Sequence, residues 1–434
     1  MKILFITSNN MIAPDMARLL QDEGNQVKLF IDDKNRSDNF ENIIKKCKNW
    51  KQELAWVGKE GLIIFDDVGY GKIQDNLREH GFAVFGGNSE SDKLEMKRAY
   101  AQDILKDHGL QTLETIDFNN IDDCVNFIKK SKKTWVLKQN DHKLNINTVS
   151  QFKDNQDILD VLKLCKTKYK NKVKVITLQE KVEGIEIGVG RFFNGKNWVG
   201  PVEINFEHKR LFDDDVGPMT TEMGTLAWFE TEKDSVLFKK TLFKLKPFLK
   251  KIKFKGDFEV NFIINGKNIY PLEITPRLGS PIVHLQSELL NLKWSQFLKA
   301  VALGKSIRPK WKKGYGLVVL LAVPPFPYMT KLGKNSPRGV IVYLDKVTKN
   351  DFKHIFFEGM SKEKIQGKEQ FYISDEEGYV LYVTGVGKTI AKVQKDVYEI
   401  IKKVYVPKSL YRRDIGSKFL LSDEKLLKKW GYIK

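Results

Sequence analysis

The sequence lacks several features that would assign it to a specialised class of protein. It has no apolar run of about 18 residues, so it predicts no membrane-spanning helix. Residues 1–10 begin with a short apolar stretch that is followed by polar residues. They lack the longer apolar core and the cleavage site of a secretory signal peptide. The three cysteines, Cys47, Cys124 and Cys165, have no metal-like spacing. A sparse, odd-numbered set of cysteines fits a reducing cytoplasm without disulfides.

Acidic residues are outnumbered, which gives the chain a strong positive charge. Its 434 residues include 74 Lys and Arg against 55 Asp and Glu, a formal net charge of +19. A basic balance of this kind favours polyanionic partners. The lysines are spread along most of the chain and not gathered in one segment, so we expect a solvated basic surface with a bias towards phosphorylated substrates. On this pattern we do not expect nucleic acid as a partner.

The first 88 residues alternate between strand-like and helix-like patterns. We expect strands at residues 3–7, 26–31, 61–65 and 82–85, and helices at residues 13–21 and 70–80. Such alternation predicts a parallel, doubly wound sheet. Ligands of such sheets lie beyond the carboxyl ends of the strands. Residues 7–14 and 66–71 are therefore candidate substrate loops, or else plain connections.

The remainder of the chain predicts a longer mixture of helices and hairpins. Helices are expected from Ser89 or Ser91 to residue 108, and at residues 121–131, 155–168, 232–252 (interrupted by Pro247), 281–290, 294–303 and 388–403. Strands are expected at residues 135–139, 173–182, 185–193, 197–200, 257–264, 268–275, 315–323 and 378–384. The sequence becomes strand-rich after about residue 306, and residues 304–313 suit a domain boundary.

The hairpin at residues 257–275 carries the most informative pattern. Its strands are joined by Asn265-Gly266-Lys267, a strong turn signal. The two-residue period places Glu259 and Asn261 on one face, opposite Tyr270 or Glu273 and Thr275. Hard oxygen ligands of this kind suit Mg²⁺. Glu273 is the best single candidate, although Glu259 and Glu273 are also compatible with solvent-facing strand positions.

Weaker signals point to a nucleotide. Lys138 ends an apolar strand, where its ammonium group can reach phosphates, but lysines are common at strand ends. Residues 179–184 form a possible hinge whose backbone could bind an adenine edge, with Glu183 accepting from a ribose hydroxyl. Residues 207–218 mix bases and acids in one run, which alone would read as a solvated loop.

Taken together, these segments resemble the phosphoribosylamine–glycine ligase (glycinamide ribonucleotide synthetase) family of the ATP-grasp superfamily, as a divergent member. The resemblance runs in order over nearly the whole chain. It rests on Phe85-Gly86, Leu94-Glu95, His108-Gly109, His208-Lys209-Arg210, Asp213, Asp215, Gly217-Pro218, Thr220, Met223-Gly224, Leu272-Glu273, Arg277, Gly279, Pro281, Gly378-Tyr379-Val380-Leu381 and Tyr411-Arg412-Arg413-Asp414-Ile415-Gly416.

This resemblance implies an α/β ATP-grasp fold with three parts. They are an N-terminal doubly wound parallel-sheet domain (1–88), an ATP-grasp domain (89–305, with a lid at about 110–180) and a strand-rich C-terminal α+β domain (306–434). It also implies ATP and Mg²⁺ or Mn²⁺ as cofactors. In the implied reaction, ATP first phosphorylates a carboxylate, which in the family is that of glycine. An amine, which in the family is phosphoribosylamine, then attacks the acyl phosphate. We also expect a cytoplasmic protein that is a monomer or homodimer and acts in purine nucleotide biosynthesis.

The resemblance assigns expected roles to individual residues. The ATP-binding set is Arg98, Lys138, Lys143, Glu180, Lys181, Val182, Glu183 and Glu186. The metal set is Glu273 with Asn261 or Thr275. The catalytic set, which orients the carboxylate or acyl phosphate, is Arg277, Lys209, Arg210, Asp213 and Asp215. The substrate-binding set is Ser8, Asn9, Asn10, His208 and Gly279.

Two departures from the family keep other functions open. The first loop reads Ser8-Asn9-Asn10-Met11-Ile12 where the family has a glycine-rich turn. No glycine follows Lys138 over residues 139–145, where the family has a glycine-rich phosphate loop, so His142 or Lys143 would have to replace it. Three hypotheses remain: an active ligase, a degenerate member that only binds nucleotide or a phosphorylated metabolite, and a nucleic-acid-associated basic protein.

Overall fold

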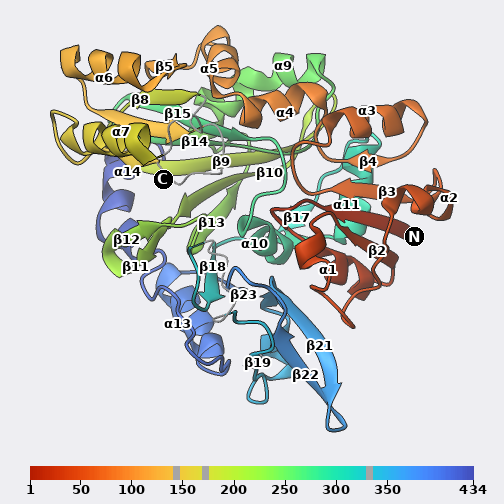
Figure 1. Cartoon of the computed structure of the whole chain (residues 1–434). Coiled ribbons are helices and arrows are strands. Elements are labelled where there is room, and N and C mark those ends of the chain that lie inside the picture. The colour runs from red at the N-terminus through yellow and green to blue at the C-terminus, as the bar shows by residue number, and fades with distance from the viewer. Residues whose placement is uncertain (140–146, 169–174, 329–335) are drawn as a thin grey trace. The chain divides into compact units, whose positions relative to one another are not determined.

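The computed structural model describes residues 1–139, 147–168, 175–328 and 336–434, and Lys143 therefore lies outside the described residues. The chain divides into two compact units, each described on its own. The larger unit contains Met1–Asp92, Ile187–Glu259 and Thr275–Lys434, and the smaller unit contains Lys93–Glu186 and Val260–Ile274. Figure 1 shows the elements of both units along the chain. The domain boundaries expected from the sequence remain a prediction.

The larger unit begins with a parallel sheet. Its strands β1 (Lys2–Thr7), β2 (Gln26–Ile31), β3 (Leu62–Phe65) and β4 (Val84–Phe85) lie in the order β2-β1-β3-β4, all parallel. Helices α1 (Met16–Asp22) and α3 (Gly71–Glu79) connect them. β3 is buried along its whole length because its four residues are all apolar, as strands covered on both faces are. The predicted doubly wound parallel sheet is confirmed.

The largest sheet of the described residues has the strand order β15-β14-β9-β10-β13-β18-β23-β20. Its strands from β9 onwards belong mainly to the larger unit, and the paired strands there are antiparallel. The strands are β9 (Ile185–Asn194), β10 (Trp198–Glu207), β13 (Gly224–Glu230), β14 (Lys255–Asn265), β15 (Asn268–Thr275), β18 (Tyr315–Ala322), β20 (Ile355–Phe357) and β23 (Tyr379–Gly387).

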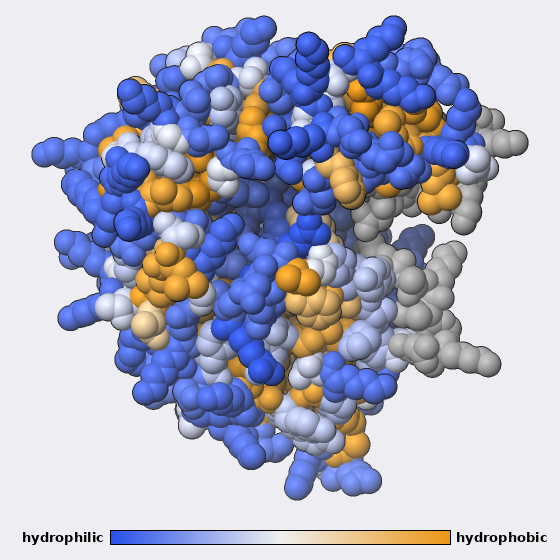
Figure 2. Space-filling model, turned by 90° about the vertical axis from the view of Figure 1, so that its left-hand side faces the viewer, coloured by the Kyte–Doolittle hydropathy of each residue, from blue (hydrophilic) through white to orange (hydrophobic). Residues whose placement is uncertain are grey.

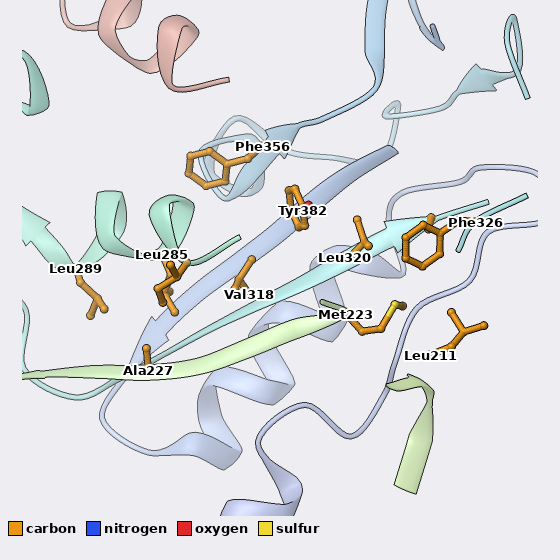
Figure 3. Close-up of a cluster of buried hydrophobic side chains, with 12 residues drawn as sticks. Leu211, Met223, Ala227, Leu285, Leu289, Val318, Leu320, Phe326, Phe356 and Tyr382 are labelled. Atoms are coloured by element: carbon orange, nitrogen blue, oxygen red, sulfur yellow. The ribbon is translucent and has the colours of Figure 1, made fainter. Parts of the chain in front are cut away.

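Helix α10 (Ile282–Leu289) is fixed against this sheet by an apolar cluster. Leu285 and Leu289 are fully buried and point towards Ala227 and Val318 of the strands (Figure 3). The helix can lie this close because Gly316 has no side chain: a Cβ there would stand 2.5 Å from Cδ1 of Leu285. Each buried leucine contributes about 1.5–3 kcal/mol of transfer free energy. This anchoring also fixes the loop that precedes α10.

The rest of the larger unit is built from short elements. A three-stranded sheet has the order β19-β22-β21, with β19 (Ile341–Val342), β21 (Met360–Ile365) and β22 (Lys368–Ile373). Helix α13 (Ile390–Ile401) packs on β23 and β18. The others are α2 (Leu54–Val57), α4 (Ser89–Met96), β11 (Arg210–Phe212), β12 (Val216–Met219), α8 (Val236–Lys240), α9 (Lys246–Lys251), β16 (Leu290–Asn291), α11 (Trp294–Ala302), β17 (Lys310–Trp311), α12 (Lys349–Phe352) and α14 (Glu424–Trp430).

The smaller unit has its own sheet and core. Strands β5 (Thr115–Phe118), β8 (Ile176–Glu180), β6 (Trp135–Gln139) and β7 (Thr148–Val149) are antiparallel in that order. Helices α6 (Ile121–Lys130) and α7 (Gln156–Lys168) share one apolar core with β6 and β8, which includes Trp135 and the thiols Cys124 and Cys165. Helix α5 (Arg98–Asp107) precedes them. All three cysteines of the chain are free.

Two predicted helices are wrong in their continuity. The helix expected from Ser89 to residue 108 is interrupted at Lys97, whose φ of −131° and ψ of 89° are not helical, so α4 and α5 are separate. The helix expected over 232–252 is broken at Thr241, with a φ of −123° and a ψ of −96°. Pro247 is not the cause, because it lies in the first turn of α9, where proline is tolerated. The helix expected from residue 13 begins at Met16.

The surface is mostly polar. Figure 2 shows hydrophilic residues over most of the visible face, with hydrophobic residues in small separate groups. Leu421, Val216, Tyr405 and Phe212 are among the large hydrophobic side chains that remain exposed. Within the described residues, no helix combines the length and apolar character needed to cross a membrane.

Candidate active site

The ends of strands β1 and β3 bring two carboxylates and a polar loop together. β1 and β3 are parallel neighbours, so Thr7 and Asp66 follow at the same edge of the sheet. Thr7 Oγ1 donates to Asp66 Oδ2 at 2.7 Å, and the amide of Ala13 donates to the same oxygen at 2.9 Å. Asp66 is fully buried. It therefore ties the loop after β1 to the end of β3.

Asp67 binds the residues predicted to hold substrate. Ser8 Oγ donates to Asp67 Oδ2 at 2.5 Å, and Asn10 Nδ2 donates to the same oxygen at 2.8 Å. Asn10 remains exposed at the rim, as does Asn9, whose carbonyl accepts from Arg36 at 3.3 Å. The predicted loop residues are thus organised by a carboxylate, and their polar groups border a solvent-accessible edge.

The two neighbouring carboxylates differ in their surroundings. Burial, followed by the charge of Asp67, raises the pKa of Asp66 to about 7, although three donated hydrogen bonds act in the opposite direction. The sequence alone did not single out Asp66 or Asp67, although residues 66–71 were a candidate loop. The available signal was a pair of acids directly after the buried strand β3.

Arg277 reaches this edge from the loop before α10. Its Nε lies 3.4 Å from Asp67 Oδ1, and its Nη1 donates to the carbonyl of Leu278 at 2.8 Å. Gly279 follows, and a Cβ there would stand 2.5 Å from Cγ2 of Ile282. A larger residue there would require the Ile282 side chain to shift. The structure brings the predicted residues Ser8, Asn10 and Arg277 together around Asp67.

A second group of predicted residues lies on the loop between β10 and β13. Lys209 pairs with Glu207, Nζ to Oε2, at 2.9 Å. The side chain of Arg210 donates to the carbonyl of Gly217 at 2.8 Å, within the β11–β12 ribbon. His208 is buried and accepts a hydrogen bond from the amide of Gly416 at 3.2 Å.

The predicted catalytic acids of this loop face the C-terminal segment. Asp215 Oδ1 accepts from Nη1 of Arg412 at 2.8 Å, and Asp213 Oδ1 accepts from the amide of Arg413 at 2.8 Å. Burial, and then the nearby Arg412 charge, lower the pKa of His208 to about 4, so it is neutral at physiological pH. These contacts join two motifs that lie about 200 residues apart in the sequence.

The predicted nucleotide residues lie in the smaller unit. Lys138 sits on β6, opposite Thr177 of β8. Glu180 pairs with Lys133 at 2.7 Å, and Lys181 donates through Nζ to the carbonyl of Ser150 at 2.8 Å. These two side chains are held by the sheet that carries Lys138, and the segment after β8 continues through Val182 and Glu183 to Glu186 at the start of β9.

The turn of the metal hairpin is tied to the same segment. The carbonyl of Glu183 accepts from Nδ2 of Asn265 at 2.9 Å. On β15, Glu273 is partly exposed, and its Oε2 lies 3.9 Å from Nη1 of Arg98. The structure thus places a predicted phosphate-binding cation beside the predicted metal carboxylate.

The donor set on this hairpin fits a hard divalent cation. Within the smaller unit, Glu273 offers a carboxylate and Asn261 an amide oxygen on the neighbouring strand. Thr275, the last residue of β15, belongs to the larger unit. Among the described residues, no group of three or more His, Cys, Asp or Glu is arranged to hold a metal ion. A Mg²⁺ ion here would therefore share its shell with substrate oxygens, as Mg²⁺ commonly does.

Sequence reasoning also missed a buried chain of acids and amides in the larger unit. Asn205 Nδ2 donates to Glu203 and to Glu259, at 2.9 Å each. Gln286 Nε2 of α10 donates to Glu203 at 2.7 Å and to Asp257 at 2.9 Å. Burial raises the pKa of Glu203 to about 8 and that of Asp257 to about 7. The period-two pattern of β14 could have revealed it, had the burial of that face been known.

Comparison with known proteins gives consistent relatives. Residues 96–282 match the family model described as phosphoribosylglycinamide synthetase, ATP-grasp (A) domain. A phosphoribosylamine–glycine ligase of Fusobacterium nucleatum is 23% identical over 409 residues, covering 88% of this chain and 91% of the relative. The corresponding Thermotoga maritima ligase is 26% identical over 342 residues, covering 77% and 80%.

Solved structures agree at the level of the fold. The crystal structure of the Thermotoga maritima phosphoribosylamine–glycine ligase has a TM-score of 0.69 and 20% identity, covering 96% of this chain and all of that one. The biotin carboxylase domain of Hydrogenobacter thermophilus 2-oxoglutarate carboxylase, in complex with MgADP and bicarbonate, has a TM-score of 0.62 and 11% identity, covering 94% and 91%.

Proposed function

Because this chain is a distant member of the phosphoribosylglycinamide synthetase family within the ATP-grasp superfamily, we propose that it couples ATP to the joining of a carboxylate and an amine. The α/β ATP-grasp fold predicted from the sequence is confirmed. The proposed reaction is that of a phosphoribosylamine–glycine ligase, with glycine as the carboxylate and phosphoribosylamine as the amine. Its proposed place is purine nucleotide biosynthesis in the cytoplasm.

The proposed chemistry has two bond-forming steps. The substrate carboxylate attacks the γ-phosphorus of ATP, which forms an acyl phosphate and releases ADP. The amine nitrogen then attacks the acyl carbon, loses a proton and expels phosphate, which leaves an amide. No enzyme nucleophile is required. The demands on the protein are to position the reactants and to balance the charge of the transferring phosphoryl group.

Residues of the smaller unit are proposed to hold the nucleotide. Lys138 and Arg98 supply positive charge for the phosphates, and residues 180–183 line the adenine and ribose. Glu273 and Asn261 would hold Mg²⁺, which, when bound, would neutralise charge on the phosphoryl group. The supporting observation is that Arg98 and Glu273 already lie 3.9 Å apart.

Residues of the larger unit are proposed to hold the carboxylate and the amine. Arg277 has a guanidinium group suited to bind a carboxylate or acyl phosphate in two-point geometry, and Lys209 with Arg210 adds further positive charge. Ser8, Asn9 and Asn10 are proposed to contact the amine substrate. The single observation that carries the assignment is the family match over residues 96–282, which spans the proposed nucleotide, metal and carboxylate residues.

A two-substrate dependence tests the proposal. The purified chain is incubated with ATP, Mg²⁺, glycine and freshly prepared phosphoribosylamine, and phosphate release is followed. We expect release only when both glycine and phosphoribosylamine are present, with formation of the amide seen by mass spectrometry. Binding of ATP-Mg²⁺ by thermal shift, without phosphate release across a panel of amines and carboxylates, would instead support a nucleotide-binding protein without ligase activity.

One observation favours a different amine as a second candidate. The loop that would contact the amine is organised by Asp66 and Asp67, and among its described residues 8–13 there is no basic side chain. A phosphate group gains nothing from two neighbouring carboxylates, whereas an ammonium or hydroxyl group does. An amine panel that includes unphosphorylated amines separates the two candidates, because the better substrate has the higher kcat/KM.

A further inference from the structure

Arg412 joins the C-terminal segment to the loop that carries Lys209 and Arg210. Its guanidinium group is almost completely buried. Nε and Nη2 donate to the two oxygens of Asp414 at 2.8 and 2.6 Å, and Nη1 donates to Asp215 Oδ1 at 2.8 Å and to the carbonyl of Arg210 at 3.1 Å. One side chain therefore fixes a carboxylate and a backbone carbonyl of the loop at the same time.

Backbone groups complete this join, which we call the clasp (Arg412 and Asp414 with Arg210 and Asp215). The amide of Asp214 donates to Asp414 Oδ2 at 2.9 Å. Asp214 and Asp215 have φ angles of 59° and 55°, in the left-handed region that non-glycine residues rarely adopt. Such a conformation persists only where its surroundings hold it. In this loop the clasp supplies those contacts.

The loop has little support of its own. It consists of the two short strands β11 and β12, and an isolated two-stranded ribbon is marginal in water. Phe212, Val216 and Met219 are exposed and contribute little packing, whereas Leu211 of β11 is buried in the apolar cluster that also holds α10. Within the ribbon, Arg210 donates to the carbonyl of Gly217. The position of Lys209 and Arg210 thus depends on contacts from outside the ribbon.

We propose that Arg412 is a positioning residue for the ligase reaction: it holds the loop of residues 207–219 so that Lys209 and Arg210 meet the carboxylate or acyl phosphate. The inference rests on the proposed function for its kinetic part. Arg412 does not itself contact substrate in this scheme. A lysine would keep the charge but could not donate in the fork geometry to Asp414, Asp215 and the Arg210 carbonyl together. The fork, and not the charge alone, sets the loop.

The kinetic test compares neighbouring arginines. R412K is assayed beside R413K, because Arg413 is adjacent and exposed, and its guanidinium group lies over the ring of Tyr411. With the substrate pair that the wild-type chain turns over, at 20 °C, we expect R412K to lower kcat at least tenfold, with KM for ATP within twofold. R413K should stay within twofold in both. A kcat of R412K within twofold of wild type overturns the proposal.

Hydrogen exchange gives a readout that does not depend on activity. We expect R412K to increase deuterium uptake in peptides covering residues 207–219, while R413K matches wild type. Unchanged uptake in R412K overturns the clasp even if the ligase assignment holds. Increased uptake in R412K, in a case where the wild-type chain turns over no substrate pair, would retain the clasp and reject the ligase.

A second pair of variants guards against misfolding of R412K. D215N removes one acceptor of the clasp, and D214N is its matched control because Asp214 is exposed and joins through its backbone only. We expect D215N, but not D214N, to reproduce the loss of kcat. The double variant R412K/D215N should be no slower than R412K, because both changes break the same contact between Arg412 and Asp215. If the losses of kcat in R412K and D215N multiply in the double variant, the two residues act independently, which would contradict positioning through Asp215.

Discussion

Arg277 and Asp67 form an ion pair between the loop before α10 and the end of β3, with 3.4 Å between Nε and Oδ1. The two residues are distant in sequence but are both held by rigid elements, β3 on one side and the anchored helix α10 on the other. Asp67 also accepts from Ser8 and Asn10. One carboxylate therefore sets the relative positions of the proposed carboxylate-binding arginine and the proposed amine-binding loop.

Replacing Arg277 should impair turnover more than folding. R277A removes the proposed carboxylate ligand, and we expect kcat/KM for the carboxylate to fall at least a hundredfold, or about 3 kcal/mol. Asp67 keeps three other donors, so the loss of unfolding free energy should stay near 1–2 kcal/mol. R277K, which keeps the charge without the fork, should lie between R277A and wild type. Equal activity of R277A and wild type would remove Arg277 from the site.

Glu273 should be essential for catalysis and nearly neutral for stability. Its side chain is 41% exposed, and its neutralisation leaves no buried charge unpaired. We expect E273Q to reduce ATP-dependent phosphate release at least a hundredfold, with a thermal midpoint within a few degrees of wild type. E369Q is a suitable control, because Glu369 is exposed on β22 and pairs only at the surface with Lys362. An active E273Q would show that the metal site lies elsewhere.

Local signals in the sequence located several elements well. β6 has the predicted bounds, Trp135–Gln139, and β15 has the predicted bounds, Asn268–Thr275. β6 is a short apolar run, and β15 is bounded by the Asn265-Gly266-Lys267 turn and by Pro276. The break at Thr241 was not predictable, because the apolar period of residues 232–252 continues across it and only tertiary packing selects the interruption.

Contacts between distant segments were beyond a reading of one sequence. Asp66 and Asp67 were visible as an acidic pair, but their role depends on β1 lying beside β3. Arg412 and Asp215 are separated by 197 positions, and both lie in recognised motifs whose contact no local pattern encodes. The network of Glu203 and Asp257 was hidden for a different reason: acidic residues on a strand normally predict a solvent-facing side, and here that side is covered by Gln286 of α10.

His208 should act as a neutral hydrogen-bond acceptor. Its pKa is lowered to about 4, mainly by burial, while the Gly416 amide donates to Nε2. H208A leaves that buried amide without its partner, and we expect a loss of about 1–3 kcal/mol of unfolding free energy. H208Q, which can accept through its amide oxygen, should recover part of this loss. Chemical denaturation at pH 7 measures both, and equal stability of H208A and wild type would contradict the assigned bond.

The pH dependence of His208 gives a second check. A group whose folded pKa is lowered below its unfolded value of about 6.5 loses stabilisation as the pH falls from about 6.5 through about 4, because the unfolded chain binds the proton more readily. The wild-type chain should therefore lose more stability than H208Q between pH 7 and pH 4. A parallel decline in both proteins would show that His208 does not contribute.

The carboxyl network should make the protein less stable in alkali. Burial raises the pKa of Glu203 to about 8, and the ordinary value for glutamate is about 4.3. The stabilisation from a raised carboxyl pKa is complete at pH values below the pKa of the unfolded chain. It is lost as the pH rises through the folded-state pKa of about 8. We expect the unfolding free energy of wild type to fall between pH 6 and pH 9, by up to about 1.4 kcal/mol per pH unit for one proton. In E203Q, which cannot ionise at this position, the decline should be shallower. Denaturation curves of both proteins at matched ionic strength measure the difference, and an identical slope in wild type and E203Q would mean that Glu203 does not retain its proton in the folded state.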